Sequence, residues 1–435
     1  MPVWLCLLFC LLFTGCGSSQ EPFIWQADSY PVNLDPQITR EEGDLLAIRH
    51  LYRGLFALDE TGEPQPEGCG EYTLSPDGST VTFTLKEDLT WWDGVPVTSR
   101  DYAFGVSRAQ DPDTGSPYRE ELEGILSLDC PDDRTLVVTL AEGADPARLF
   151  ALPGTYPCRE DFFRSCEGSY GLSKEKVLGC GYYRLSSWGS ETMTLTRCQG
   201  EGIETFRVAS PQWEGSPTGW LETADEGIPM VTWTVLLNPG QPVFAQPQIC
   251  QAFASTLYSA DLSPGPGFIP ARQLFPPTLG EEDCLPDLGQ PGPLLWEGLK
   301  SLDQDGIKGL TLLAPEDFRF EDLVNGINQE LQQQLGVFCS VERVGSSVLL
   351  ERIEAGEYDL ALVPCQPRSG SGEELFARWA ALAGSKAESQ KGLLSECRVI
   401  PLFHQVFRLK TSQPVEGLWV SPYTGSPDLN HAFYP

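Results

Sequence analysis

The back half of the chain alternates short apolar runs with helical patterns, and this alternation limits the possible folds more than any other feature. The apolar runs cover residues 310–313, 337–344 and 358–363, which are lengths typical of strands. Helical patterns fill both intervals between them. A strand–helix–strand–helix–strand order favours parallel pairing, because each helix returns the chain to the same end of the sheet. The sequence therefore predicts an α/β lobe.

The two helical patterns differ in length. The first is a stripe of apolar side chains four residues apart, formed by Leu323, Ile327, Leu331 and Leu335. This spacing puts the stripe on one helix face, and Gly336 follows as a natural C-cap. The second pattern uses Val348, Leu349 and Ile353 and stops at Gly356. We interpret the leucine-rich stripe as core packing and not as a set of cofactor contacts.

A turn, a strand and a helix are predicted in that order in the first third of the chain. Residues 75–78 read Ser-Pro-Asp-Gly, which is typical turn chemistry. Alternate apolar side chains then indicate a half-buried strand, namely Val81, Phe83 and Leu85. Thr98 and Asp101 resemble a capping box, and the helix after them ends near Asp111. By itself this segment indicates only a hairpin followed by a helix.

Acidic residues outnumber basic ones 61 to 29, which gives the chain of 435 residues a formal net charge of −32. This excess argues against nucleic acid as a partner, because a phosphate backbone requires Lys and Arg. The acidic excess also argues against peripheral binding to anionic membrane surfaces. We interpret the acidity as solubility on a cell exterior. The length predicts two or three domains.

The N-terminus resembles a lipoprotein signal. Its apolar run at residues 3–13 is too short to span a bilayer comfortably. The small residues Thr14 and Gly15 then precede Cys16, and a Gly/Ser segment follows. This pattern predicts a signal peptide at residues 1–15, acylation of Cys16 and a lipidated tether at residues 16–21. The lipid would be the only membrane anchor.

Fourteen cysteines occur in the chain, and 11 of them lie between Cys69 and Cys397. Two interpretations stay open. Some cysteines could pair as disulfides outside the cytoplasm, and the best candidates are Cys158, Cys166, Cys180 and Cys198. In the other interpretation, most are small buried apolar side chains.

Motifs for catalysis and metal binding are absent from the sequence. No C-x-x-C occurs, and the three histidines are not at metal-ligand spacing from any cysteine. The sequence has no G-x-S-x-G, no H-E-x-x-H and no phosphate-binding P-loop. We therefore expect no metal, no cofactor and no enzymatic activity.

Short motifs follow one another in a recognisable order over nearly the whole mature chain. They are LDP at 34–36, LYRGL at 51–55, WWDGVPVTSRD at 91–101, DPDTGSPY at 111–118, GYYRL at 181–185, LLN at 236–238, FPP at 275–277, GEYD at 356–359 and IPL at 400–402. Together they resemble the extracellular solute-binding proteins of family 5, the oligopeptide-, dipeptide- and nickel-binding receptors of ABC importers.

The resemblance implies a two-lobed α/β fold of the periplasmic-binding-protein (Venus-flytrap) type with a β-rich insertion subdomain. Lobe I would be discontinuous, and the insertion would interrupt it at residues 59–177. Lobe II would cover residues 241–404. The segments expected in lobe I are 22–58, 178–240 and 405–435. Ligand would bind between the two closing lobes.

The resemblance also implies ligand contacts in the first lobe. Thr39, Arg40 and Glu41 occupy a loop that lines the cleft in the family. Tyr118 matches the tyrosine of the family's "SPY" motif, which contacts ligand in some members. These four residues are candidates for ligand binding.

Two further candidates follow the apolar run at 358–363. By family spacing, a tryptophan of the family falls on Cys365, and the aspartate that anchors a peptide's N-terminal amine falls near Arg368. A cation would then replace the amine anchor. If Arg368 faces the cleft, it would favour a carboxylate or phosphate on the ligand. In the alternative interpretation, Arg368 is a surface loop residue.

The function implied by the resemblance is that of a substrate-binding lipoprotein of an ABC importer. A monomer would bind a peptide or similar small solute and deliver it to the membrane permease. It would lie outside the cytoplasm, in the periplasm or on the outer face of the cytoplasmic membrane. A second hypothesis stays open, because the amine-anchoring aspartate is missing and the family carries a longer segment between Thr205 and Trp233. The same fold could serve as a peptide sensor or surface interaction lipoprotein without transport.

Overall fold

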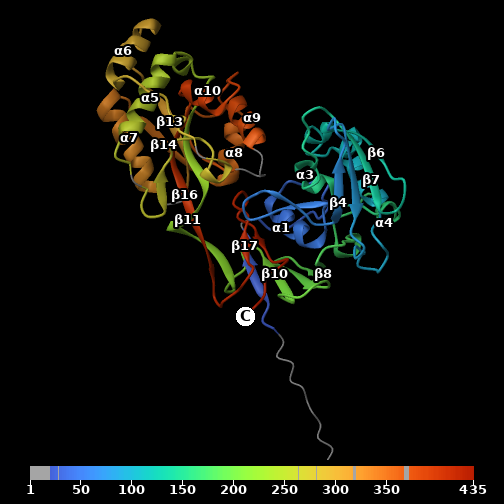
Figure 1. Cartoon of the computed structure of the whole chain (residues 1–435). Coiled ribbons are helices and arrows are strands. Elements are labelled where there is room, and N and C mark those ends of the chain that lie inside the picture. Colours follow the sequence, from blue (N-terminus) through green and yellow to red (C-terminus); the bar gives the residue numbers. More distant parts are fainter. Residues whose placement is uncertain (1–19, 28, 263, 281, 317–319, 367–371) are drawn as a thin grey trace, which may run out of the picture.

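The computed structural model describes residues 20–27, 29–262, 264–280, 282–316, 320–366 and 372–435. Figure 1 shows two bodies joined by two long strands, β11 (Gly219–Leu237) and β16 (Val399–Thr411). We call residues 20–229 and 405–435 the terminal body, and residues 230–404 the α/β body. The apolar cores divide in the same way: one large core lies in the terminal body, and two lie in the α/β body.

One sheet runs through both bodies. Its order is β14 (Cys339–Val344), β13 (Leu310–Pro315), β15 (Leu360–Cys365), β11, β1 (Phe23–Gln26), β10 (Thr205–Ala209), β9 (Thr192–Arg197) and β8 (Tyr183–Trp188). β16 pairs antiparallel with β11, and β12 (Phe268–Pro270) pairs with β16. The sheet therefore forms a continuous connection between the bodies.

The α/β body has the predicted parallel core, since β13 pairs parallel with both β14 and β15. α7 (Glu321–Leu335) carries the four-residue-spaced stripe, which is buried, and ends at Gly336 with a φ of 68°. α8 (Ser346–Glu354) is the second expected helix. The strand–helix alternation in the sequence was therefore interpreted correctly.

Helices cover both faces of this part of the sheet (Figure 1). α5 (Pro247–Ser259), α6 (Pro291–Leu302) and α7 share a core with alternate strand residues such as Leu312 and Leu362. α8, α9 (Gly372–Leu382) and α10 (Gln390–Ser395) pack on the other face, against the intervening residues such as Leu313 and Ala361. Burial on both faces explains the nearly continuous apolar runs of these strands.

A separate antiparallel sheet forms the outer part of the terminal body, with the order β4 (Cys69–Leu74), β5 (Thr80–Leu85), β7 (Thr135–Leu140) and β6 (Ile125–Asp129). β5 is the predicted half-buried strand. α2 (Ser99–Gln110) is the predicted helix, and the Asp101 carboxylate accepts a 2.8 Å hydrogen bond from the Thr98 backbone N–H. Trp91 is buried in the core of this body.

The remaining elements of the terminal body are short. They are α1 (Glu42–Leu51), β2 (Phe56–Leu58), β3 (Pro64–Pro66), α3 (Pro146–Leu149), α4 (Glu160–Ser165), β17 (Trp419–Val420) and β18 (Pro427–Asp428). Single 3-10 turns occur at Pro112–Thr114, Glu121–Gly124, Pro153–Thr155, Lys174–Lys176, Pro242–Ala245 and Pro277–Leu279. α1 lies at the centre of this body, between the two sheets (Figure 1).

The cysteines of the described chain are unpaired. All 11 between Cys69 and Cys397 are free thiols; nine are buried, Cys130 is half-buried and Cys198 is exposed. The structure therefore agrees with the interpretation that most are small buried apolar side chains. The disulfide alternative for Cys158, Cys166, Cys180 and Cys198 is wrong for this structure, because burial in apolar surroundings already accounts for all but Cys198.

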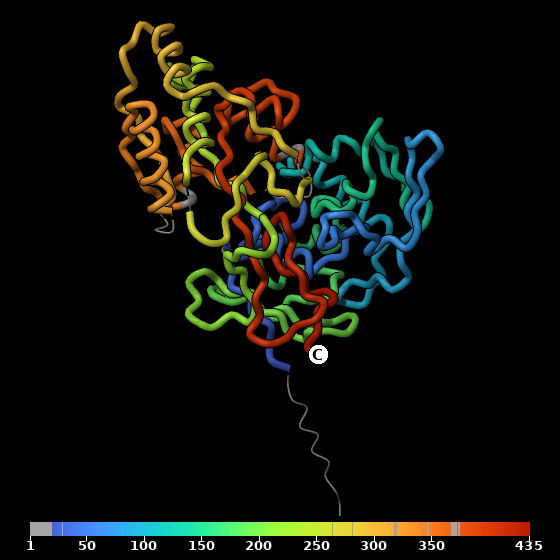
Figure 2. The backbone as a smooth tube through the Cα atoms, turned by 60° about the vertical axis from the view of Figure 1, so that its left-hand side comes forward, coloured from blue at the N-terminus to red at the C-terminus, as the bar shows by residue number. Residues whose placement is uncertain are grey.

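Both ends of the described chain lie at the same end of the molecule. Figures 1 and 2 show the start of β1 and the C-terminus close together, on the side of the terminal body away from the α/β body. Gln20 is fixed there, since its side-chain oxygen accepts a 2.8 Å hydrogen bond from the Glu204 backbone N–H. Among the described helices, none is both long and apolar enough to cross a membrane.

Candidate ligand-binding site

A cavity opens in the terminal body between α1, the insertion and the C-terminal segment. Its empty volume is about 950 Å³, with the opening to solvent included. The lining residues come from positions 40–49, 57–67, 118–121, 151–156 and 419–430. Segments separated by more than 350 residues therefore meet at one site.

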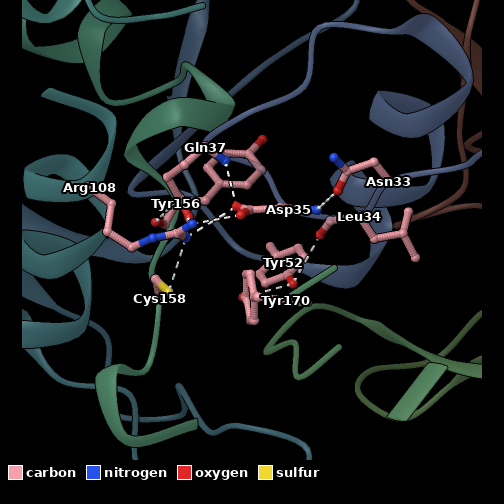
Figure 3. Close-up of polar contacts among 9 residues, drawn as sticks. All are labelled: Asn33, Leu34, Asp35, Gln37, Tyr52, Arg108, Tyr156, Cys158 and Tyr170. Carbon is pink, nitrogen blue, oxygen red and sulfur yellow. Dashed lines mark hydrogen bonds and ion pairs between the residues drawn. The ribbon is translucent and has the colours of Figure 1, made fainter. Parts of the chain in front are cut away.

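The loop before α1 is held by a buried ion pair (Figure 3). Asp35 and Arg108 are 2% and 9% exposed, and the Arg108 guanidinium donates to both carboxylate oxygens of Asp35 at 2.6 and 3.2 Å. The guanidinium also donates to the Gln37 side-chain oxygen at 2.6 Å, and the Gln37 amide donates to the Tyr156 carbonyl at 3.0 Å. Bidentate pairing of this kind fixes geometry as well as charge. The LDP motif therefore positions the loop on the insertion.

A second buried carboxylate, Asp44 in α1, fixes the remainder of this loop. It accepts hydrogen bonds from the backbone N–H groups of Val32 and Asn33 at 2.6 and 3.0 Å. Its other oxygen accepts a 2.7 Å hydrogen bond from the Thr39 hydroxyl, which in turn accepts from the Glu41 backbone N–H at 3.1 Å. Thr39 and Glu41 thus shape the entry into α1, and neither side chain lines the cavity.

Arg40 and Tyr118 form one wall of the cavity. The Arg40 guanidinium lies 4.5 Å above the centre of the Tyr118 ring and contacts the Glu121 carboxylate. The buried Tyr118 hydroxyl donates a 2.9 Å hydrogen bond to the Thr39 carbonyl, and burial raises the pKa of Tyr118. Gly154 lies directly against the ring, where a Cβ would approach ring carbons to less than 3 Å. The Tyr118 ring is therefore fixed on both sides.

The C-terminal segment forms another part of the cavity lining and is fixed to α1. The Leu429 backbone N–H donates a 3.1 Å hydrogen bond to Nε2 of the buried His50, whose Nδ1 is 2.8 Å from the Leu46 carbonyl. Burial lowers the pKa of His50, in keeping with a neutral ring that donates from Nδ1 and accepts at Nε2. Arg49 donates to the Thr424 hydroxyl at 3.2 Å.

Besides the guanidinium groups of Arg40 and Arg49, the cavity lining contains carboxyl groups. Glu67 and Asp428 both line it. The Glu67 side chain is half-buried. Desolvation by the surrounding protein raises its pKa to about 8. The positive charge of Arg53 opposes this rise in pKa, and the negative charge of Asp428 adds to it. The Asp428 carboxylate accepts a 2.9 Å hydrogen bond from the Asn430 backbone N–H. This part of the cavity is therefore poor in compensating positive charge.

Two of the residues expected at the site line the cavity, and two others lie next to it without lining it. Arg40 and Tyr118 line the cavity, and Thr39 and Glu41 support them. Cys365, in contrast, is 1% exposed in a core of the α/β body and does not reach the cavity.

The end of β15 does approach the site, through a neighbour of Cys365. The Gln366 side-chain amide donates a 3.3 Å hydrogen bond to the carbonyl of Tyr423, a cavity residue. This contact joins the α/β body to the rim of the cavity. Arg368 and the expected lipidation site Cys16 lie outside the described residues.

Several cavity residues were not expected from the sequence. They are Arg49, Glu67, Trp419, Tyr423, Asp428 and Asn430. The segment 419–430 has neither a period nor a known motif, and only its packing against α1 brings it to the site. An isolated Glu among 61 acidic residues carries no signal of its own. Among the residues that the structure describes, no group of His, Cys, Asp and Glu could hold a metal ion.

Comparisons with known proteins agree with this architecture. Residues 63–200 match the model of the bacterial extracellular solute-binding proteins, family 5, middle part. The chain is 31% identical over 187 residues to the probable deoxycholate-binding periplasmic protein YgiS of Escherichia coli K12, which covers 39% of this chain and 35% of that protein. It is also 31% identical over 174 residues to the periplasmic oligopeptide-binding protein OppA of the same strain, covering 36% and 32%.

The matched segments thus span about a third of the length of these two relatives. A solved structure extends the likeness to the whole fold. Listeria monocytogenes OppA bound to peptide aligns with a TM-score of 0.72 at 19% identity, over 96% of this chain and 99% of that one. The motif order, the two-lobed α/β architecture and the matched segment agree. The chain is thus similar to family 5 of the bacterial extracellular solute-binding proteins over residues 63–200, and its whole fold is that of the peptide-bound OppA structure.

Proposed function

We propose that the chain is a receptor that binds a peptide, or a similar small solute, at the cavity of the terminal body. The observation that carries this proposal is the cavity itself, where Arg40 from the loop after the LDP motif and Tyr118 from the SPY motif meet the C-terminal segment. An opening bounded by aromatic and charged side chains suits a small polar ligand. A peptide is favoured because OppA of E. coli and of L. monocytogenes are described as peptide-binding, whereas YgiS is described as binding deoxycholate.

The cavity is lined only by residues of the expected lobe I and its insertion, and not by both lobes as expected from the sequence. The expected lobes would supply a closing movement at its rim, where Gln366 of the α/β body contacts Tyr423. In this proposal, lobe I comprises residues 22–58, 178–240 and 405–435 with the insertion at 59–177, and lobe II comprises residues 241–404. β11 and β16 cross between the bodies, and their register shifts between Thr223 and Ile228, between Pro229 and Val231, and between Trp233 and Thr234. Such bulges interrupt the ladder and bend strands. They lie where the chain passes from one body to the other, which suits a hinge.

Peptide binding can be tested directly by native mass spectrometry on the protein purified from its own host without refolding. A co-purifying peptide or small solute would support the proposal and give the ligand class. An empty protein that also shows no thermal shift with peptide pools would contradict it. An Arg40→Ala variant should bind more weakly, because it removes one wall of the cavity, and Arg164→Ala, far from the cavity, is the matched control.

Delivery to an ABC permease is the second part of the proposal. The test compares uptake of the identified ligand by cells with and without this chain. Loss of uptake in the deletion strain supports an import receptor. Normal uptake in that strain, with peptide binding intact, would instead support the alternative in which the fold serves as a peptide sensor or surface interaction lipoprotein.

Lipid anchoring through Cys16 is the third part, and it would hold the receptor outside the cytoplasm. We expect Cys16→Ala to release the protein from the membrane fraction, because the thioether that carries the lipid cannot form. Fractionation and immunoblotting check this, with Cys198→Ala as the control that keeps the anchor. A membrane-bound Cys16→Ala variant would refute the lipidation site.

A further inference from the structure

The lining of the cavity contains more carboxyl groups than guanidinium groups: Glu67, Glu121 and Asp428 against Arg40 and Arg49. Arg40 contacts Glu121 and lies over Tyr118, and Arg49 lies 3.9 Å from Glu42. Both guanidinium groups of the cavity therefore have carboxylate partners within the protein. The carboxylates that remain in the lining are Glu67 and Asp428.

Neither Glu67 nor Asp428 forms an ion pair within the described part of the chain. The cation that most stabilises the charged form of Glu67 is Arg53, whose guanidinium is 3.4 Å from Asp88 and lies 4.9 Å from the centre of the Tyr182 ring. The polar contacts of the Asp428 side chain are with Asn430. Two carboxyl groups that share a cavity and have no ion-pair partner of their own favour a positively charged occupant.

Asn430 supplies a second, independent observation. It is 7% exposed and lines the same cavity. Its side-chain Nδ2 faces the Asp428 carboxylate at 3.4 Å, and this fixes the orientation of the amide, because a carboxylate only accepts. Its Oδ1 has no hydrogen-bond partner. Buried acceptors are normally satisfied, so this oxygen points to a donor brought by a ligand.

The aromatic lining fits the same kind of ligand. Tyr156, Trp419 and Tyr423 line the cavity beside the two carboxylates. Aromatic faces attract ammonium and guanidinium groups through the ring quadrupole. Carboxylates, an amide oxygen and aromatic faces together offer acceptors and negative potential, and they disfavour an anionic group.

We propose that the cavity binds a cationic group of the peptide, an ammonium or guanidinium, through Glu67, Asp428 and the Oδ1 of Asn430. This inference rests on the proposed function and adds the chemical class of the ligand. The same ammonium chemistry can come from a lysine side chain or from the free N-terminus of a peptide, so the test must separate these two sources.

Protonation provides a second readout. Burial raises the pKa of Glu67 to about 8, so near pH 7 the empty cavity holds this group mostly protonated. A bound cation favours the carboxylate, and binding should release a proton from Glu67 to solvent. The charged and titratable groups that interact with Glu67 are Arg53, Lys86, Asp428, Tyr102, Tyr156, Cys180 and Tyr182.

The test is isothermal titration calorimetry at pH 7 with Ala-Lys-Ala, Ala-norleucine-Ala and their N-acetylated forms. If a side chain is the source, Ala-Lys-Ala should bind at least about tenfold more tightly than the norleucine peptide, with or without acetylation. If the N-terminus is the source, acetylation should weaken both peptides at least about tenfold. Titrations in two buffers of different ionisation enthalpy should show proton release.

Variants test whether the preference for a cationic peptide depends on Glu67 and Asp428. Glu67→Gln should abolish proton release, and Glu67→Gln and Asp428→Asn should each reduce the preference for the cationic peptide to within about threefold. Glu87→Gln should keep both properties, because Glu87 is an exposed carboxylate of the same body outside the cavity. Circular dichroism of each variant verifies folding, and two independent substitutions guard against the failure of one of them.

The outcomes separate this inference from the proposed function. If all four peptides bind equally, peptide binding stands and the inference of a cation site is overturned. If no peptide binds, the proposed function fails, and butylguanidine against the neutral butylurea tests the cation site alone. Binding of butylguanidine only, lost in Glu67→Gln, supports the inference. Equal binding of the two compounds, or binding of neither, overturns it.

Discussion

At the scale of single residues, the binding loop depends on one buried charge pair. Arg108 donates to Asp35 and Gln37 and is 3.5 Å from the Cys158 sulfur (Figure 3). Its guanidinium also lies 3.9 Å from the centre of the Phe163 ring. A buried ion pair adds little net stability compared with apolar packing, but loss of one partner leaves an uncompensated charge. The pair therefore specifies where the loop lies more than it stabilises the fold.

We expect Arg108→Ala to lower the free energy of unfolding by about 3–5 kcal/mol, because Asp35 would remain buried without its partner. Urea unfolding followed by tryptophan fluorescence measures this. Arg164→Ala is the matched control: its ion pair with Glu160 is exposed, and such pairs contribute about 0–1 kcal/mol. Equal losses in the two variants would contradict the role assigned to burial.

A second residue-scale prediction concerns pH. His404 is buried in β16, with Nδ1 2.9 Å from the Thr232 hydroxyl of β11, and burial lowers its pKa from 6.5 to about 4. The folded protein therefore binds this proton more weakly than the unfolded chain does. The contribution is complete above pH 6.5 and is lost as the pH falls through the folded pKa near 4.

The lowered pKa of His404 is worth up to about 3 kcal/mol. His404→Asn retains a partner for Thr232 without the titration, so its stability should fall less than that of the native protein between pH 7 and pH 4. Chemical denaturation at a series of pH values measures the difference. Identical pH profiles would show that His404 does not titrate as described.

At the scale of elements, the sequence predicted those whose pattern is local. The period of four in α7 and the alternation in β5 follow from which side chains face a core. The first half of β11 was not expected as a strand, because its residues 222–229 alternate irregularly and lie at register shifts, outside a regular buried face.

The same reasoning explains which part of the site could be predicted. Arg40 follows the LDP motif and Tyr118 lies in the SPY motif, so both were expected. Asp428 and Asn430 reach the cavity only through packing against α1, more than 370 residues earlier in the chain. Glu67 stands out only in the folded structure, where it lines the cavity and burial raises its pKa, because no motif surrounds it in the sequence. No local pattern encodes a long-range contact of this kind.

We expect Leu331→Ala to lower the free energy of unfolding by about 2–5 kcal/mol, because it opens a cavity in the core under α7. Leu331 is fully buried in the stripe. Gln333→Ala, on the exposed face of the same helix, should change stability by no more than about 0.5 kcal/mol. Urea unfolding of both variants checks the assignment of the faces, and a comparable loss in Gln333→Ala would contradict it.

At the scale of the whole molecule, the fold is stabilised by apolar cores without crosslinks in its described part. Three large cores, one in the terminal body and two in the α/β body, bury the aromatic and aliphatic side chains. The cysteines belong to these cores or to their edges, and burial raises the pKa of thiols such as Cys180 and Cys365. Such thiols react slowly, since the thiolate is the reactive form.

Thiol counting tests this description. A protein that begins at residue 20 should release eleven equivalents of Ellman's chromophore in denaturant, because all eleven cysteines are free. In the native state, only the exposed Cys198 should react rapidly. Cys198→Ser should remove the fast phase and no other. Nine or fewer equivalents in denaturant would indicate a disulfide and contradict the structure.

The position of the two chain ends has a mechanical consequence. The start of the described chain at β1 and the C-terminus both lie on the terminal body, at the end away from the α/β body (Figures 1 and 2). A molecule attached to a surface through either end is held by its terminal body. The α/β body then carries no load. A bead, surface or dye attached at the start of β1 or at the C-terminus therefore reports on the terminal body, and any movement of the α/β body has to be recorded from a second label on α6 or α7.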